Sequence, residues 1–252
     1  MALRSYRILQ GETRMLVKLD LPSALRSMEE AVASTREKLV AHIQRFPEFR
    51  WSLEPVQKPK EPLDPVISEM YEAGWRAGVG PFASVAGAIA QAATIAAVEA
   101  GAKNVLAENG GDICLYGDRS YLVAIYAGTS PFSEKIALRV KPGRQIRGLC
   151  TSSSTIGESI SFGEADAVVV YHPSSAIIAD AAATSICNEV RGRQGMSSAV
   201  TKAKEIGEIG AVIIRGEEMA FWGRLPQVVR ISSAECDLVA KPETHSRAPS
   251  LS

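Results

Sequence analysis

The stretch Glu108-Asn-Gly-Gly-Asp112 separates two apolar runs, 104–108 and 113–116. An Asn-Gly step between strand-forming runs is one of the strongest short-range signals for a β-hairpin. The glycines permit left-handed backbone, and successive N–H groups in that conformation can form an anion-binding concavity. Carboxylates on both flanks are more than a turn requires. We therefore predict a hairpin with a ligand site at Glu108, Asn109, Gly110, Gly111 and Asp112.

A helix is predicted upstream of this turn, over residues 83–100, and consists mostly of Ala, Gly and Ser. Such a helix lets another backbone or a planar ligand come close to Gly87. Tight packing against a sheet and approach of a ligand remain equal alternatives at this position. The stretch is long enough to cross a bilayer, but Ser84, Gln91 and Glu99 interrupt it, so we expect a buried helix and no membrane segment.

The rest of the chain alternates between strand and helix patterns without an internal repeat. We predict one α+β domain over residues 1–240, with mainly antiparallel strands around the small-residue helix, and a disordered tail over 241–252. Strands are predicted at 6–9, 14–19, 121–127, 136–140, 165–171, 211–214, 219–222 and 228–231, and helices over 23–45, 66–77, 174–190 and 199–206.

Asp180 and Thr184 are four residues apart in the predicted helix over 174–190, which places both on one face. One anionic and one neutral oxygen ligand suit Mg²⁺ that is bound together with substrate phosphates. The alternative is local: Asp180 forms a cap or an ion pair, and the Thr184 hydroxyl bonds back to its own helix.

The segment Gly148–Ser154 is rich in hydroxyl groups and is expected to be a loop. Thr151, Ser152 and Ser153 suit the binding of phosphate or carbonyl oxygens. Cys150 is a candidate thiol nucleophile, with structural burial as the alternative.

The amino-acid composition limits the classes of partner and the compartment that we expect. Twenty-eight basic residues balance twenty-eight acidic ones, so no general attraction to nucleic acid is expected. Four widely spaced cysteines without a Cys-x-x-Cys pair, and a start without a signal-peptide pattern, favour the cytoplasm. A homodimer is the assembly that we consider, although no sequence feature sets the oligomeric state.

Taken in order, these segments resemble the ApbE superfamily, the FAD:protein FMN transferases once described as thiamine-biosynthesis lipoproteins. A shorter ApbE-like branch is more similar still. The resemblance rests on Gly80-Pro, Glu108-Asn-Gly-Gly-Asp-Ile113, Gly148-Leu-Cys-Thr-Ser-Ser, Ser161-Phe-Gly-Glu-Ala-Asp-Ala167 and Ala179-Asp-Ala-Ala-Ala-Thr184.

The resemblance implies two interlocked α/β subdomains with a cleft that holds FAD or FMN, its phosphates near Mg²⁺. It implies that Asp180 and Thr184 bind the metal and that Asn109–Asp112 lie near the ligand. We take Cys150 and Asp112 as candidate catalytic residues. Gly87, the residues of the glycine turn and Thr151–Ser153 are candidates for contact with the phosphate-bearing ligand.

The chain departs from the transferases at two places. Their Lys-Gly-Tyr-Ala-x-Asp string reads Ala86-Gly-Ala-Ile-Ala-Gln91 here, and their His-x-x-Asp-Pro-x-x-Gly insertion before the metal helix is absent. We therefore expect altered or lost flavin transfer. Three functions stay open: a divergent Mg²⁺-dependent flavin or nucleotide transferase, a non-catalytic binding or accessory protein, and a sulfur-handling protein that uses Cys150.

Overall fold

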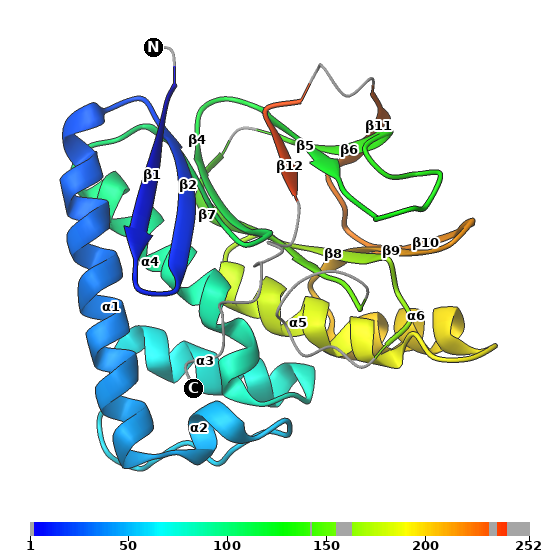
Figure 1. Cartoon of the computed structure of the whole chain (residues 1–252), viewed down its shortest axis with the longest axis horizontal. Helices are drawn as coiled ribbons and strands as arrows, with labels where there is room; N and C mark the ends of the chain where they lie inside the picture. Colours follow the sequence, from blue (N-terminus) through cyan, green and yellow to red (C-terminus); the bar gives the residue numbers. More distant parts are fainter. Residues whose placement is uncertain (1–2, 142, 155–162, 232–235, 241–252) are drawn as a thin grey trace, which may run out of the picture.

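The computed structural model describes residues 3–141, 143–154, 163–231 and 236–240, arranged in three layers (Figure 1). An eight-stranded sheet forms the middle layer. The helices cover one of its faces, and a four-stranded sheet covers the other.

The large sheet has the order β1-β2-β3-β4-β7-β8-β9-β10, and all its neighbouring strands are antiparallel. Strands from the two halves of the chain meet at the β4–β7 pair, so both halves share one sheet. Its strands are β1 (Arg4–Gln10), β2 (Thr13–Leu19), β3 (Asn104–Asn109), β4 (Asp112–Gly117), β7 (Gly143–Ser152), β8 (Ala167–His172), β9 (Gly210–Arg215) and β10 (Glu218–Gly223).

The helical layer is built around two helices rich in small residues, α4 and α5, which cross each other against the sheet. The Ser175 hydroxyl caps the start of α5 by accepting the Ile178 N–H at 3.1 Å. Asp64 does the same for α3, where Pro65 opens the helix. The helices are α1 (Leu25–Arg45), α2 (Glu48–Trp51), α3 (Pro65–Ala77), α4 (Val85–Glu99), α5 (Ala176–Glu189) and α6 (Gly195–Ile206), with 3₁₀ turns at Pro22–Ala24 and Pro81–Ser84.

The small sheet has the order β11-β6-β5-β12. Its strands are β5 (Tyr121–Ile125), β6 (Ile136–Val140), β11 (Gln227–Arg230) and β12 (Leu238–Ala240), of which β12 is parallel to β5. Side chains of the large sheet alternate between two cores. On β4, Ile113 and Leu115 face the small sheet, whereas Cys114 faces the helices. Asp112 therefore points to the helical side.

The predicted α+β class, with mainly antiparallel strands and a central small-residue helix, is confirmed. The prediction of a loop at Gly148–Ser154 is wrong for its first five residues, which form the end of β7. Hydroxyl-rich sequence there lies between two other strands and is buried from Arg147 to Ser152. The single domain over 1–240 stays a prediction, and the tail 241–252 lies outside the described residues.

Among the described residues, Pro81–Glu99 is one helical stretch long and apolar enough to cross a membrane. In this fold it is an interior helix. Ala88, Ala90, Ala93 and Ala97 of α4 are fully buried between α1, α5 and the sheet. Burial inside the domain explains the composition without a bilayer.

Candidate functional site

The β3–β4 turn forms as the sequence predicts. Asn109 pairs with Asp112, and Gly110 and Gly111 adopt left-handed backbone with φ of 65° and 98°. The Glu108 carboxylate accepts the Gly111 N–H at 2.7 Å. One N–H of the expected anion-binding concavity is therefore satisfied by the chain's own carboxylate, which gives Glu108 a role in holding the turn.

A row of polar side chains crosses three strands on the helical face of the sheet. Asn109 on β3 pairs with Asp112 on β4, and continuation of the β4–β7 register places Cys150 of β7 opposite Asp112. The Asn109 amide donates to the Ala86 carbonyl of α4 at 3.2 Å. The Thr151 N–H donates to the Asp112 carboxylate at 3.3 Å. The structure thus brings the turn, β7 and α4 together at one place.

The Asp180 side chain reaches the same location from α5. Its carboxylate accepts the Gly87 N–H at 2.8 Å. A Cβ at Gly87 would lie 2.5 Å from the Ala176 carbonyl oxygen and 2.9 Å from the Asp180 Cβ. Close packing of α5 therefore occupies the space beside Gly87. The two sequence-based alternatives for this glycine are packing against a sheet and approach of a ligand, whereas its neighbour in the structure is a second helix.

Asp112 and Asp180 form a buried pair of carboxyl groups, each 7% exposed. Burial raises the pKa of Asp180 to about 7, opposed by the N–H groups of Gly87 and Ala86. Burial, and then the charge of Asp180, raise the pKa of Asp112 well above its usual range. Among the described residues neither carboxylate has an ion-pair partner (the ion pairs join other residues).

The two carboxyl groups of this pair are ligands of the kind that Mg²⁺ prefers. The described residues contain no group of three or more His, Cys, Asp or Glu side chains that could hold a metal. The two carboxylates supply oxygen ligands, and Thr184 carries a nearly buried hydroxyl one turn along α5 from Asp180. Mg²⁺ is commonly held by one or two carboxylates plus substrate phosphates. These groups therefore suit Mg²⁺ that arrives with a phosphate-bearing ligand.

Two hydroxyl groups of the serine-rich segment are buried without a hydrogen-bond partner among the described residues, those of Thr151 and Ser152. Ser152 pairs with Val168, whose side chain belongs to the core on the helical side, so Ser152 shares the face of Cys150. The Thr151 side chain faces the small sheet with Val169, and only its N–H serves the site. Ser153 is also buried. Ser152 is thus the hydroxyl best placed for a ligand.

Cys150 is fully buried, and its thiol donates to the Ala176 carbonyl at 3.3 Å. Burial, followed by the charges of Asp112 and Asp180, raises the pKa of this thiol well above its usual range. A thiolate at neutral pH is therefore disfavoured. These observations favour structural burial, and nucleophilic catalysis by Cys150 stays a prediction without structural support.

Alkylation of the native protein tests this directly. We expect iodoacetamide to modify Cys236, which is partly exposed, well before the buried Cys114, Cys150 and Cys187. Peptide mapping by mass spectrometry gives the rate for each thiol, and unfolding in urea should make the four rates similar. Preferential modification of Cys150 in the folded protein would instead support its role as a nucleophile.

One network was not predicted from the sequence, and it holds the start of α5. The Gln91 amide oxygen accepts the Ala176 N–H at 2.7 Å, and its nitrogen donates to Glu69 at 2.9 Å. Glu69 also accepts the Ser175 hydroxyl at 2.6 Å. The sequence feature that could have indicated this network is a glutamine within a helix of otherwise small or apolar residues. At the position where the transferases have aspartate, this chain uses Gln91 to fix the helix that carries Asp180.

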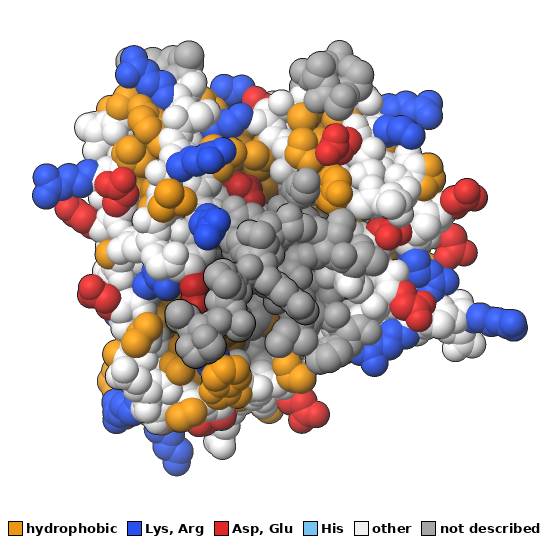
Figure 2. Space-filling model, viewed as in Figure 1, with side chains coloured by type: hydrophobic (Ala, Val, Ile, Leu, Met, Phe, Trp, Pro, Cys, Tyr) orange, Lys and Arg blue, Asp and Glu red, His pale blue; other side chains and the backbone are white. Residues whose placement is uncertain are grey.

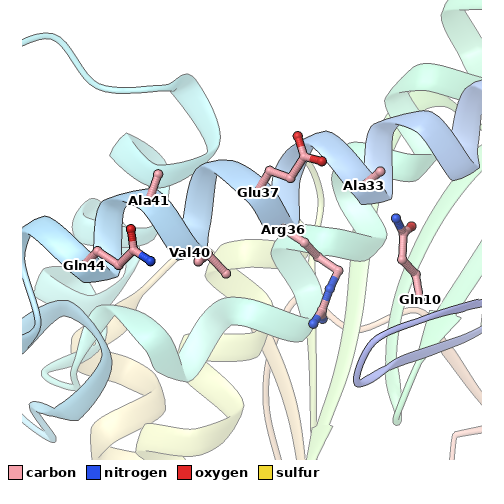
Figure 3. A pocket seen from close by; sticks show the side chains of 7 residues that line it. All are labelled: Gln10, Ala33, Arg36, Glu37, Val40, Ala41 and Gln44. Carbon is pink, nitrogen blue, oxygen red and sulfur yellow. The ribbon is translucent and has the colours of Figure 1, made fainter.

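A pocket of about 390 Å³ lies elsewhere, between α1 and the end of β1. Figure 3 shows its lining side chains, which come from Gln10 and from one side of α1 and are Ala33, Arg36, Glu37, Val40, Ala41 and Gln44. Arg36 donates to the Thr13 hydroxyl at 2.9 Å, which ties α1 to the β1–β2 hairpin. None of the residues predicted for the site lines this pocket.

Comparison with known proteins places this arrangement in a class. Residues 2–211 match the family model described as AbpE bacteria. A UPF0280 protein of Methanocaldococcus jannaschii is 41% identical over 230 residues, covering 89% of this chain and 92% of the relative. A UPF0280 protein of Methanosphaerula palustris is 44% identical over 201 residues, covering 80% and 83%.

Among solved structures, the flavinyl transferase ApbE of Pseudomonas stutzeri, in its apo form, matches 87% of this chain and 94% of its own. The sequence identity is 14% and the TM-score 0.49. The match to the family model assigns the protein to the ApbE-like class that the sequence strings indicated. Within that class, the chain belongs to the AbpE bacteria family and has the UPF0280 proteins as relatives.

Proposed function

We propose that this protein binds a phosphate-bearing small molecule of the flavin nucleotide type together with Mg²⁺, and that it is a divergent Mg²⁺-dependent flavin or nucleotide transferase. The observation that carries the proposal is the buried pair Asp112 and Asp180, drawn together from β4 and α5. Membership of the ApbE-like family supports the class of ligand.

When ionised, the two buried carboxylates carry negative charge that no described cation offsets. Moving an ionised carboxylate out of water is costly, and two such groups side by side repel each other. A divalent cation between them would offset both effects. Asp112 and Asp180 would hold Mg²⁺ together with the Thr184 hydroxyl, while the Ser152 hydroxyl would be available to a phosphate oxygen.

When bound, Mg²⁺ would stabilise the negative charge that develops on the leaving phosphate group. The chain's own residues position and shield that centre. The Gly87 N–H orients the Asp180 carboxylate, and the Thr151 N–H orients that of Asp112. Asn109 ties the glycine turn to α4 through the Ala86 carbonyl. The near-complete burial of both carboxylates would strengthen their attraction for a bound cation, because the surroundings screen charge less than water does.

The proposal is tested by titrating FMN and FAD into the purified protein by calorimetry, with MgCl₂ in one series and EDTA in the other. Binding that needs Mg²⁺ is the expected result. An absorbance spectrum of the protein as purified gives an independent check for bound flavin. Equal flavin affinity in EDTA, or no affinity in either series, would remove the Mg²⁺-flavin assignment.

The pH dependence of Mg²⁺ binding follows from the raised pKa values. Mg²⁺ binds the ionised carboxylates, so each proton held in the metal-free state must leave. With the pKa of Asp180 at about 7, the apparent Kd for Mg²⁺ should rise at least about tenfold as pH falls from about 8 to about 6. Calorimetry in buffers of different ionisation enthalpy measures the released protons. An affinity that stays constant over this range would show that Asp180 is not a ligand.

Covalent flavin transfer to a threonine acceptor peptide is expected to be weak or absent. Ala86 and Gln91 stand where the transferases have Lys and Asp, and Gln91 is engaged at the start of α5. This engagement favours the second candidate function, a non-catalytic protein that binds the same ligand. Mass spectrometry of the peptide after incubation with FAD and Mg²⁺ detects the adduct. Rapid, Mg²⁺-dependent flavinylation would show that neither missing side chain is required.

Several expectations about the protein's surroundings remain proposals. We propose a cytoplasmic protein that acts on a small molecule, without nucleic acid or membrane as a partner, and with a homodimer as the assembly. On the face shown in Figure 2, basic and acidic side chains are interspersed, as the balanced charge leads one to expect. Sedimentation analysis measures the oligomeric state.

A further inference from the structure

A second pocket, of about 710 Å³, lies far along β7 from the carboxylate pair. Its lining residues are Lys141, residues at the start of β7, the end of β8 with Pro173, and residues 224–227. Four of the lining side chains are cationic, and none is acidic. They are Lys141, Arg144, Arg147 and Arg224.

Arg147 is the innermost of these cations and is 5% exposed. Its guanidinium donates to the carbonyl groups of Lys141 and Gly143, the latter at 2.8 Å. Its Nε is buried without a hydrogen-bond partner. None of the ion pairs among the described residues includes Arg147, so its charge is met only by carbonyl groups. A buried cation in this state calls for an anion.

The other cations lie at the mouth of the pocket. Arg144 pairs with the Asp118 carboxylate at 3.1 Å, and that side chain lies outside the lining. Lys141 and Arg224 are exposed and form no ion pair with a described residue. The remaining walls combine amide groups with less polar surface and comprise Gln145, Gln227, Tyr171, Pro173, Leu225 and Pro226.

This pocket is separate from the Asp112–Asp180 site. Side chains alternate along β7, so Arg147 shares the face of Leu149, which lies in the core toward the small sheet. Cys150 belongs to the core on the helical side. The two places therefore lie on opposite faces of the large sheet, and toward opposite ends of the same strand.

We infer that this second pocket binds an organic phosphate, through its cationic side chains and through the apolar surface beside them. The guanidinium of an arginine matches phosphate oxygens in two parallel hydrogen bonds. Tyr171, Pro173 and Leu225 offer surface for an apolar or aromatic body. The volume exceeds what an inorganic ion would fill, which favours a ligand of nucleotide size.

Calorimetric titration of the full chain with ADP in EDTA tests this inference. Excess EDTA removes Mg²⁺, so the result does not depend on the proposed Mg²⁺ site. Wild-type protein should bind ADP with an affinity that falls as salt is added. Arg224→Glu reverses one exposed charge at the pocket and should weaken binding at least about tenfold. Arg7→Glu makes the same charge change on exposed β1 and should leave the Kd within about twofold.

Inorganic pyrophosphate and citrate define the ligand class in the same assay. Weaker binding of pyrophosphate than of ADP supports a contribution from the apolar walls. Citrate that binds as tightly as ADP would overturn the choice of phosphate. Absence of ADP binding at millimolar concentrations, or equal losses in Arg224→Glu and Arg7→Glu, would overturn the site. A short RNA that competes through Arg224 at lower concentration than ADP would replace the small molecule with nucleic acid.

Discussion

Replacement of Asp180 by asparagine should abolish Mg²⁺-dependent flavin binding and leave the unliganded protein at least as stable as the wild type. Asparagine keeps an oxygen that can accept the Gly87 N–H, which the Asp180 carboxylate accepts at 2.8 Å. It removes the negative charge, and with it the attraction for a divalent cation. The two effects are separable because one concerns the ligand and the other the empty protein.

The stability effect has a definite sign. The pKa of Asp180 is raised by burial from 3.8 to about 7, so between these values the folded state holds more protons than the unfolded state. The contribution of Asp180 to stability is therefore most favourable below about pH 4 and declines as pH rises to about 7. Asp180→Asn should gain roughly 1 to 3 kcal/mol at about pH 8 and little at about pH 4.

Urea melts at both pH values and calorimetry with FMN and Mg²⁺ measure these effects on one variant. Glu29→Gln, an exposed position on α1, is the matched loss of one negative charge and should change neither. If Asp180 were a structural cap or ion pair, the asparagine variant would lose roughly 1 to 3 kcal/mol at neutral pH. A destabilised variant that binds flavin and Mg²⁺ normally would rule out the metal assignment.

The parts of the fold that could be predicted are those whose signals are local. The Asn109–Asp112 turn follows from two adjacent glycines between strand-forming runs. The i, i+4 spacing of Asp180 and Thr184 and the small residues around Gly87 likewise lie within single helices. Their meeting at one place was implied only by the family resemblance, because spacing within one element carries no information about its neighbours.

The central strand β7 could not be predicted for a physical reason. Hydrophobic periodicity identifies a buried strand when its buried residues are apolar. The last six residues of β7 are buried, yet they include Arg147, Thr151 and Ser152. Buried polar residues in the middle of a sheet depart from the ordinary pattern, and such departures are expected at functional sites. Thr151 and Ser152 lie at the carboxylate site, and Arg147 lines the second pocket.

The role of Gln91 shows a second limit of sequence reasoning. Comparison with the transferases marks this position as the loss of an aspartate. In the structure, its amide bridges Glu69 of α3 and the Ala176 N–H of α5. Both partners are distant in sequence, so no local pattern could have identified them. The sequence comparison shows only that a charge is missing at position 91, whereas the structure shows that Gln91 joins two helices there.

Gly87→Ala is the second substitution with a large expected effect, and its sign separates packing from helix propensity. Alanine in a helix interior is ordinarily favoured over glycine by about 1 kcal/mol. Here a Cβ would lie 2.5 Å from the Ala176 carbonyl oxygen, which belongs to the backbone and cannot rotate away. Overpacking of this kind costs about 1 to 3 kcal/mol. We therefore expect a net loss of stability.

The same substitution should also weaken Mg²⁺-dependent flavin binding, because relief of the clash moves α5 away from α4. The Asp180 carboxylate would then separate from the Gly87 N–H that orients it. Ala92→Gly, in the same helix, calibrates the propensity effect and should cost about 1 kcal/mol without a loss of binding. Gly148→Ala tests the contact between α5 and the sheet. Its Cβ would lie 2.3 Å from the Ser175 carbonyl oxygen, so we expect it to push α5 away from β7 and to lower both stability and flavin binding. A Gly87→Ala protein that is stabilised and binds flavin normally would mean that α5 need not be held this closely for Asp180 to act.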